Sequence, residues 1–226
     1  MNRENRYEIK YILDNSKLSE VNQWLYKCTF ASKSYPMRRV NSLYFDDVNY
    51  SSVRDNLAGI SNRKKLRLRW YGFGKTEFHP SFEIKSRDGR LGNKITFPIK
   101  SLEENLMELN VKEILFRCTT ELNKLNIIFD HHLVPTLQTS FEREYFVDHD
   151  GIRITIDKNI KFYNSSLYKK LKKNLDTNYP YHVMELKFSP TLKDNVAAII
   201  KDLHLTPKRH SKYLVGMAAL GFSVYI

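Results

Sequence analysis

The chain has 226 residues, of which 42% are hydrophobic and 13% aromatic. This composition excludes an intrinsically disordered protein, because enough apolar surface is present to outweigh the entropy lost on folding. The 37 Lys and Arg residues outnumber the 25 Asp and Glu residues, and the resulting positive charge favours an anionic partner such as nucleic acid, an acidic lipid surface or phosphates.

No stretch approaches about 18 uninterrupted apolar residues, so the sequence predicts no transmembrane helix. The opening MNRENRYEIK is polar and lacks the apolar core of a signal peptide. Cys28 and Cys118 lie far apart without metal-ligand spacing, which predicts reduced thiols and no disulfide. We therefore expect a cytoplasmic protein.

Alternating polar and apolar residues predict eight strands, and stretches of helical periodicity interrupt them. In chain order, the strands are expected at 3–13, 39–46, 64–71, 81–87, 93–99, 135–147, 152–159 and 181–188, with helices at 18–28, 101–125 (one helix or two), 191–203 and 210–220. Ser101 and Glu104 fit a capping box. Asp88-Gly89 and Gly92-Asn93 supply turn residues between two strands.

No repeat, low-complexity tract or linker divides the sequence, so one domain is expected over residues 1–226. Eight strands in one α+β domain predict a closed antiparallel barrel, because closure removes exposed strand edges. The helices would then pack outside the barrel or plug one of its mouths.

Five of the predicted strands have one apolar face and one face dense in charges of both signs, since side chains alternate along a strand. The charged faces carry Arg6, Glu8 and Lys10; Lys65, Arg67 and Arg69; Glu83, Lys85 and Arg87; Arg153, Thr155 and Asp157; Glu185 and Lys187. A solvated face of an open sheet alternates in the same way, so both interpretations stay open. The frequent Arg favours phosphate binding, because its planar fork donates two parallel hydrogen bonds.

Seven blocks, in order along nearly the whole chain, resemble the VTC domain: RYEIKY (6–11), SLYFDD (42–47), LRLRWYG (66–72), FEIKSR (82–87), RITID (153–157), MELKF (184–188) and HSKYLVGM (210–217). The VTC domain is the polyphosphate-polymerase domain of the vacuolar transporter chaperone complex and belongs to the triphosphate tunnel metalloenzyme superfamily. The resemblance implies an eight-stranded antiparallel tunnel with a C-terminal plug helix.

The resemblance also implies the site residues. Phosphate-binding residues would be Lys10, Arg67, Arg69, Lys85, Lys94, Arg143, Arg153, Lys187, Arg209, Ser211 and Lys212, of which Arg67, Arg69, Lys85 and Lys212 would act in catalysis. Glu185 would bind a Mn²⁺ or Mg²⁺ cofactor. Glu83, Asp157 and Glu8 are further ligand candidates, for which a salt-bridge role is the alternative.

Two departures from the family pattern bear on this assignment. Hydrolytic members open with E-x-E-x-K, whereas this chain has Arg6-x-Glu8-x-Lys10. Losing the first Glu removes a potential metal ligand and suits the polymerase branch. Near the C-terminus, Lys208 and Arg209 compete for one basic position, and a helical spacing of three from Lys212 favours Arg209.

The resemblance implies transfer of the γ-phosphate of ATP to a polyphosphate chain. Two alternatives stay open: a triphosphatase in which water is the acceptor, and a non-catalytic polyphosphate or nucleotide sensor that partners a membrane protein. Such a separate partner would place the chain at the inner face of a membrane. Nucleic-acid binding is not expected, because the acids interleaved with the Arg residues would repel a phosphate backbone.

Overall fold

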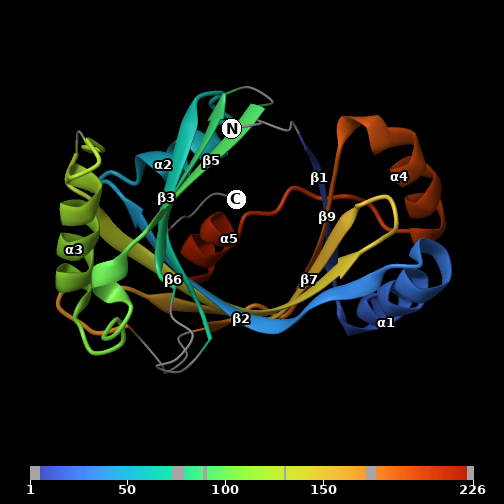
Figure 1. Cartoon of the computed structure of the whole chain (residues 1–226), viewed down its shortest axis with the longest axis horizontal. Coiled ribbons are helices and arrows are strands. Elements are labelled where there is room, and N and C mark those ends of the chain that lie inside the picture. The colour runs from blue at the N-terminus through green and yellow to red at the C-terminus, as the bar shows by residue number, and fades with distance from the viewer. Residues whose placement is uncertain (1–5, 73–78, 89–90, 130, 172–176, 223–226) are drawn as a thin grey trace. The chain divides into compact units, whose positions relative to one another are not determined.

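The computed structural model describes residues 6–72, 79–88, 91–129, 131–171 and 177–222 (Figure 1). The chain forms two compact units, each assembled from three segments. Unit 1 comprises Met1–Arg38, Phe141–Ile160 and Asn178–Ser211, and unit 2 comprises Arg39–Ser140, Lys161–Thr177 and Lys212–Ile226. Over the described residues, the strands are hydrogen-bonded in the order β1-β9-β7-β6-β2-β3-β4-β5, and the two-residue β8 pairs with β7.

The strands were largely predicted. The structure has β1 (Tyr7–Leu13), β2 (Ser32–Asp46), β3 (Arg63–Tyr71), β4 (Ser81–Asp88), β5 (Leu91–Pro98), β6 (Val134–Val147), β7 (Arg153–Asn164), β8 (Thr177–Asn178) and β9 (His182–Phe188). The α+β class is confirmed, and every pairing whose register is known is antiparallel. Closure of the sheet into a tunnel stays a prediction. The predicted start of the first strand and the Asp88-Gly89 turn lie partly outside the described residues.

Unit 1 packs helices against one apolar sheet face. The α1 helix (Asn15–Trp24) continues into a π-helical turn (Leu25–Thr29), and α4 (Lys193–Ile200) lies beside it (Figure 1). The Nε1 group of Trp24 donates to the carbonyl of Ile199 over 2.8 Å, joining the two helices. Strand side chains such as Ile154 and Leu186 are fully buried in the same core. Because strand side chains alternate, this packing directs the charged residues of β7 and β9 to the opposite face.

Unit 2 has its own core under α3 (Val111–Asn123), which contains Leu68 of β3, Phe82 of β4 and Ile114 of the helix. The short α2 (Ser51–Leu57) was not predicted, because only Val53 of its seven residues is buried and the apolar periodicity is therefore weak. The C-terminal α5 (Lys212–Ala219) also belongs to this unit.

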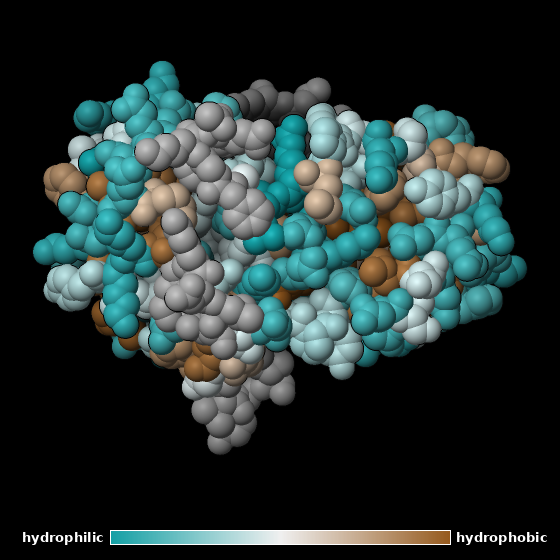
Figure 2. All heavy atoms as spheres, turned by 90° about the horizontal axis from the view of Figure 1, so that it is seen from below, coloured by the Kyte–Doolittle hydropathy of each residue, from teal (hydrophilic) through white to brown (hydrophobic). Residues whose placement is uncertain are grey.

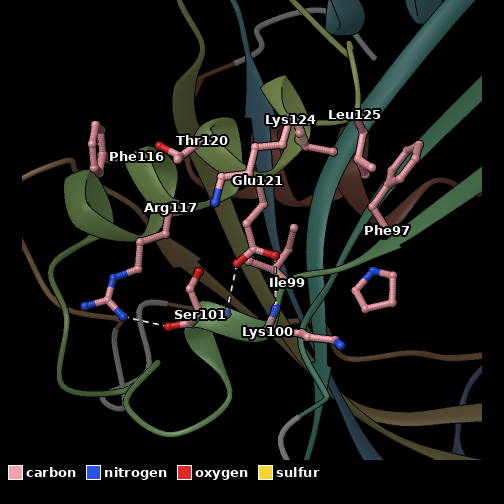
Figure 3. A pocket seen from close by; sticks show the side chains of 12 residues that line it. Phe97, Ile99, Lys100, Ser101, Phe116, Arg117, Thr120, Glu121, Lys124 and Leu125 are labelled. Atoms are coloured by element: carbon pink, nitrogen blue, oxygen red, sulfur yellow. Dashed lines mark hydrogen bonds between the residues drawn. The ribbon is translucent and has the colours of Figure 1, made fainter.

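The predicted helix over 101–125 was wrong at its start. Residues Lys100–Leu102 form a 3₁₀ turn, and the capping box consists of Asn110, directly before α3, and Glu113 in its first turn. The carboxylate of Glu121 accepts from the backbone N–H groups of Lys100 (3.2 Å) and Ser101 (2.9 Å), as Figure 3 shows. Ser101 therefore receives a cap from α3 and does not cap a helix of its own.

A helix was predicted over 210–220, and the observed α5 begins two residues further along the chain, at Lys212. Gly216 of α5 is buried, and a Cβ atom there would lie 2.6 Å from Leu137 of β6 and 2.8 Å from Phe162 of β7. Only a glycine allows the helix to approach these strands so closely. The close packing fixes Lys212 and Tyr213 in the first turn of α5.

We expect Gly216→Val to lower the free energy of unfolding by about 2 kcal/mol, because the added methyl groups overpack a filled core. Ala219→Val, at an exposed position of the same helix, is the control and should cost less than about 1 kcal/mol. Urea denaturation of both variants measures the difference. Equal losses would contradict the close-packing role of Gly216.

The face of the molecule drawn in Figure 2 is mainly polar. Figure 2 shows one face, on which hydrophilic residues predominate and hydrophobic residues form small separate groups. Cys28 is half-buried and Cys118 buried, and both are free thiols. Among the described helices, none combines the length and apolar character that crossing a membrane requires.

Candidate functional site: two charged clusters

The first cluster lies on the charged face of unit 1 and is built by strand register. The antiparallel pairing of β1 with β9 sets Lys10 opposite Glu185 and Glu8 opposite Lys187. Lys10 Nζ lies 2.6 Å from Glu8 and 3.6 Å from Glu185, while Lys187 Nζ lies 2.5 Å from Glu185 and 3.9 Å from Glu8. Two carboxylates and two ammonium groups thus alternate. We call Glu8, Lys10, Arg143, Asp157, Glu185 and Lys187 cluster 1.

The surroundings of Glu185 stabilise its ionised form. Burial opposes ionisation, but the positive charges of Lys10, Lys187 and Arg143 outweigh burial and hold the pKa of this carboxyl well below its usual range. Burial likewise lowers the pKa of Lys10, and the charges of Glu185 and Glu8 more than compensate, so the net shift is upward. Both groups are therefore ionised throughout the physiological pH range.

The segment before α5 contacts cluster 1. Lys10 Nζ donates to the carbonyl of His210 over 3.1 Å, and the N–H of Lys208 donates to the carbonyl of Lys10 over 2.8 Å. Arg209 was preferred over Lys208 because a helical spacing of three would place it on the face of Lys212. Since α5 begins only at Lys212, Arg209 lies before the helix and that reason does not hold. Both side chains are exposed, and the choice between them stays a prediction.

Arg143 and Asp157 form the most buried ion pair of cluster 1. Arg143 donates from Nε over 2.5 Å and from Nη2 over 2.7 Å to the two carboxylate oxygens of Asp157. The carboxylate is 1% exposed. Burial lowers the pKa of Arg143, but the charge of Asp157 exceeds that effect and raises it. Because the guanidinium engages both oxygens of Asp157, this acid is better suited to holding Arg143 than to binding a metal.

Glu185 and Glu8 are the acids of cluster 1 that could hold a hard divalent cation, which would compete with the lysine ammonium groups beside them. Magnesium is usually held by one or two carboxylates together with phosphate oxygens and waters, and Glu185 and Glu8 supply two carboxylates in one cluster. Thr155 lies directly opposite Glu185 in the β7–β9 register. Its buried Oγ1 has no hydrogen-bond partner among the described residues. A buried hydroxyl oxygen without a described hydrogen-bond partner thus belongs to the residue opposite the acid.

The second cluster lies on one face of β3, β4 and β5 in unit 2. Register places Lys65 opposite Lys85 and Lys85 opposite Lys94, and it also places Arg63 opposite Arg87. Like charges directly opposite each other destabilise a sheet. Among the side chains described on this face, Glu83 is the only acid. We call Lys65, Arg67, Arg69, Glu83, Lys85 and Lys94 cluster 2.

Glu83 organises part of cluster 2. It accepts from Arg67 Nε over 2.7 Å and lies 3.2 Å from Lys94 Nζ. Burial disfavours its ionisation, yet the charges of Arg67, Arg69 and Lys94 lower its pKa to about 2. Like Asp157, Glu83 is therefore engaged by cations, and its hydrogen bond with Arg67 orients that guanidinium group.

Tyr44 of β2 was not assigned a role from the sequence. Arg67 Nη1 donates to its hydroxyl over 3.3 Å. Its ring stacks on Tyr213 of α5 with 4.8 Å between centroids. Burial raises the pKa of Tyr44, but the charges of Arg67, Arg69 and Lys212 prevail and lower it. The SLYFDD block contains Tyr44, but nothing local to that block signals its contact with α5.

The Tyr213 hydroxyl completes this network. It donates to Asp46 Oδ2 over 2.8 Å and accepts from Thr136 Oγ1 over 3.2 Å. The adjacent Lys212 is half-buried at the start of α5. Asp46 and Thr136 therefore fix the first turn of the helix that carries Lys212.

The predicted residues divide between the units. Unit 1 holds Lys10, Arg143, Arg153, Lys187, Arg209, Ser211, Glu8, Glu185 and Asp157, and unit 2 holds Arg67, Arg69, Lys85, Lys94, Lys212 and Glu83. Arg153 is exposed and lies opposite Lys187. A separate pocket of unit 2, between α3 and the Lys100–Leu102 turn (Figure 3), contains none of these residues.

Two solved structures share this fold. One is an X-ray structure of a candidate adenylate cyclase from Vibrio parahaemolyticus, with a TM-score of 0.53, 13% identity, and coverage of 95% of this chain and 99% of that one. The other is a protein from Pyrococcus horikoshii OT3, with a TM-score of 0.50, 12% identity, and coverage of 94% and 99%. At these identities the likeness concerns the fold alone.

The sequence comparisons identify the family. The VTC domain model matches residues 5–221, so the chain belongs to the VTC domain family, and the predicted resemblance is confirmed. The family lies within the superfamily of triphosphate-handling tunnel proteins. The vacuolar transporter chaperone complex subunit 2 of Saccharomyces cerevisiae (strain ATCC 204508 / S288c) is 24% identical over 231 residues. The match covers 77% of this chain and only 28% of that relative.

Proposed function

We propose that this chain is a phosphotransferase of the polyphosphate-polymerase type, which moves the γ-phosphate of ATP to the end of a polyphosphate chain in a tunnel-shaped sheet. The observation that carries the proposal is the cation ladder of cluster 2. Lys65, Lys85 and Lys94 are cross-strand neighbours of equal charge on one face of the sheet, and such a row of cations attracts a polyanion. A polyphosphate offers negative charge at successive phosphate groups.

In the proposed reaction, a terminal oxygen of the polyphosphate attacks the γ-phosphorus of ATP. The bond between the γ-phosphorus and the β–γ bridging oxygen breaks, and ADP leaves. Such a transfer needs charge neutralisation and in-line positioning more than covalent help. Arg67 and Arg69 can donate paired hydrogen bonds to phosphate oxygens. Lys85 and Lys94 neutralise charge, and Glu83 keeps Arg67 oriented.

Cluster 1 is the proposed metal site. A Mn²⁺ or Mg²⁺ ion there would neutralise negative charge on phosphate oxygens that bind to cluster 1. Glu185 would hold the ion, with Glu8 and the Thr155 hydroxyl beside it. Lys10, Lys187 and Arg143 would attract phosphate oxygens, because they place three positive charges around the proposed metal ligand Glu185.

Incubation of the purified chain with ATP and Mn²⁺, followed by gel resolution of the products, tests the reaction. A ladder of phosphate chains is the expected result. Orthophosphate without a ladder would replace the proposal with a triphosphatase, in which water is the acceptor. Binding without turnover would replace it with a polyphosphate or nucleotide sensor.

We expect Lys94→Met to weaken triphosphate binding without disturbing the fold. The Lys94 side chain is half exposed, so its ion pair with Glu83 contributes little to stability. A tenfold weaker affinity would reduce triphosphate-induced stabilisation by about 1.4 kcal/mol at saturating ligand. Thermal melts with and without triphosphate measure this.

Lys64→Met is the matched control, because Lys64 is exposed on the same sheet and its side chain points to the opposite face of β3. It should leave triphosphate-induced stabilisation intact. The same loss in both variants would show that only overall charge matters and would remove Lys94 from the site.

A further inference from the structure

One segment of unit 1 carries cations without acids. From Val21 to Phe45 the chain contains no Asp or Glu, but it contains Lys27, Lys33, Arg38 and Arg39. The portion over residues 25–38 lies entirely in unit 1. It follows α1 directly and runs into β2 (Figure 1). We call residues 25–38 the basic aromatic segment.

This segment exposes large apolar side chains. Phe30 is 78% exposed, Tyr26 66%, Tyr35 58% and Met37 57%. Every residue over 32–38 is exposed, although strand residues normally bury one face. Within unit 1 this part of β2 is the last strand in the order, and Pro36 suits such an edge because it cannot donate to a further strand.

The fold holds Phe30 outward. Trp24 and Leu25 are buried and anchor the turn. Thr29 Oγ1 donates to the carbonyl of Leu25 over 2.7 Å and accepts from the N–H of Ala31 over 3.1 Å, which wraps the chain around the π-helical turn. Phe30 then adopts a left-handed backbone with φ of 52°, which is uncommon for a bulky residue. Together with the other exposed apolar side chains of the segment, Phe30 at this backbone position favours a contact with a partner.

The chemistry of the segment matches an anionic bilayer surface. Lys and Arg are attracted to anionic headgroups, while Tyr, Phe and Met bury apolar groups at the headgroup boundary. Among the acids of β6, Glu144 does not offset these cations, because it pairs with Lys158 at 2.7 Å. Base stacking on nucleic acid is less suited to Tyr35, whose ring contacts both Tyr145 and Arg38.

We propose that the basic aromatic segment is a membrane-docking site, through which unit 1 binds directly to an anionic lipid surface. Phe30 and Tyr26 enter the headgroup region, and Lys27 and Lys33 contact the lipid phosphates. This inference is independent of the phosphotransferase reaction. A chain that docks without turning over ATP would leave the docking proposal intact.

Co-sedimentation of the full chain with vesicles tests the proposal. The test compares phosphatidylcholine vesicles with and without about 30% phosphatidylserine. Excess triphosphate is present to occupy clusters 1 and 2, so that these clusters do not bind the lipid headgroups. The chain should sediment with the anionic vesicles and remain in solution with the neutral ones. Tyr26→Ser with Phe30→Ser should reduce partitioning at least roughly tenfold, and Lys27→Gln with Lys33→Gln roughly fivefold for each Lys.

Phe116→Ser is the matched control, because Phe116 is 69% exposed on α3 of unit 2 and should leave sedimentation unchanged. Circular dichroism confirms that each variant is folded. The proposal is overturned if the chain ignores anionic vesicles, or if the segment variants sediment like the unaltered chain. It is also overturned if the segment variants still bind vesicles but lose self-association, which would make a second copy of the chain the partner. Loss of single-stranded nucleic-acid binding with intact vesicle binding would likewise make nucleic acid the partner.

Discussion

Replacing Glu185 by Gln should reduce polyphosphate synthesis from ATP by at least about 100-fold, the size of effect seen when a central electrostatic contact is removed from an active site. Gln keeps the shape of the side chain but removes the negative charge that a divalent cation needs. Since the carboxyl pKa lies well below its usual range, the unaltered protein should keep its metal dependence down to mildly acidic pH. The half-saturating Mn²⁺ concentration should rise strongly in the variant.

Glu144→Gln provides the control. Glu144 also belongs to unit 1 and also pairs with a lysine, Lys158, at 2.7 Å, but it lies outside cluster 1. Glu185→Gln weakens the pairs with Lys10 and Lys187, and Glu144→Gln weakens the pair with Lys158, so the control shows whether the loss of Glu–Lys pairing alone changes the Mn²⁺ requirement. Metal-free triphosphate binding should be unchanged or tighter in the Glu185 variant, because a repulsive carboxylate is gone. An unchanged Mn²⁺ requirement with a near-normal rate would overturn the ligand assignment.

The charged faces could be predicted because alternation is a local property. The predicted parity of Arg67, Glu83 and Glu185 depends only on each strand's own sequence. Register does not follow from that parity. The pairing that sets Lys85 between Lys65 and Lys94 emerges only when three strands align, and Lys65, although placed on the charged face, was therefore not recognised as part of a ladder.

Contacts between segments that are distant along the chain could not be predicted from the sequence. The stack of Tyr44 on Tyr213 joins β2 to the C-terminal helix, and no spacing along the chain indicates it. Helix starts were also predicted poorly, because several Ser, Asn and Glu combinations satisfy the same capping pattern. The structure uses Asn110 and Glu113 where the prediction used Ser101 and Glu104.

The second large expected effect is the loss of stability when the buried ion pair between Arg143 and Asp157 is broken. Arg143→Met removes the bidentate partner of Asp157, whose carboxylate is 1% exposed. Breaking a buried ion pair on one side typically costs about 3–5 kcal/mol, because a buried charge loses its compensation. Urea denaturation at pH 7 should show a loss of this size.

The pH dependence identifies the cause of that loss. Protonation removes the uncompensated charge of Asp157, so the deficit of Arg143→Met should be largest at neutral pH and should shrink as the pH falls toward 4. Arg143→Met combined with Asp157→Leu should recover much of the stability, since an apolar pair can replace a buried ion pair. Lys158→Met, which breaks the more exposed pair with Glu144, should cost less than about 1 kcal/mol. If the double variant is no more stable than Arg143→Met, the buried charge is not the cause, and the packing of Arg143 over the Phe141 ring, 5.2 Å from its centroid, accounts for the loss.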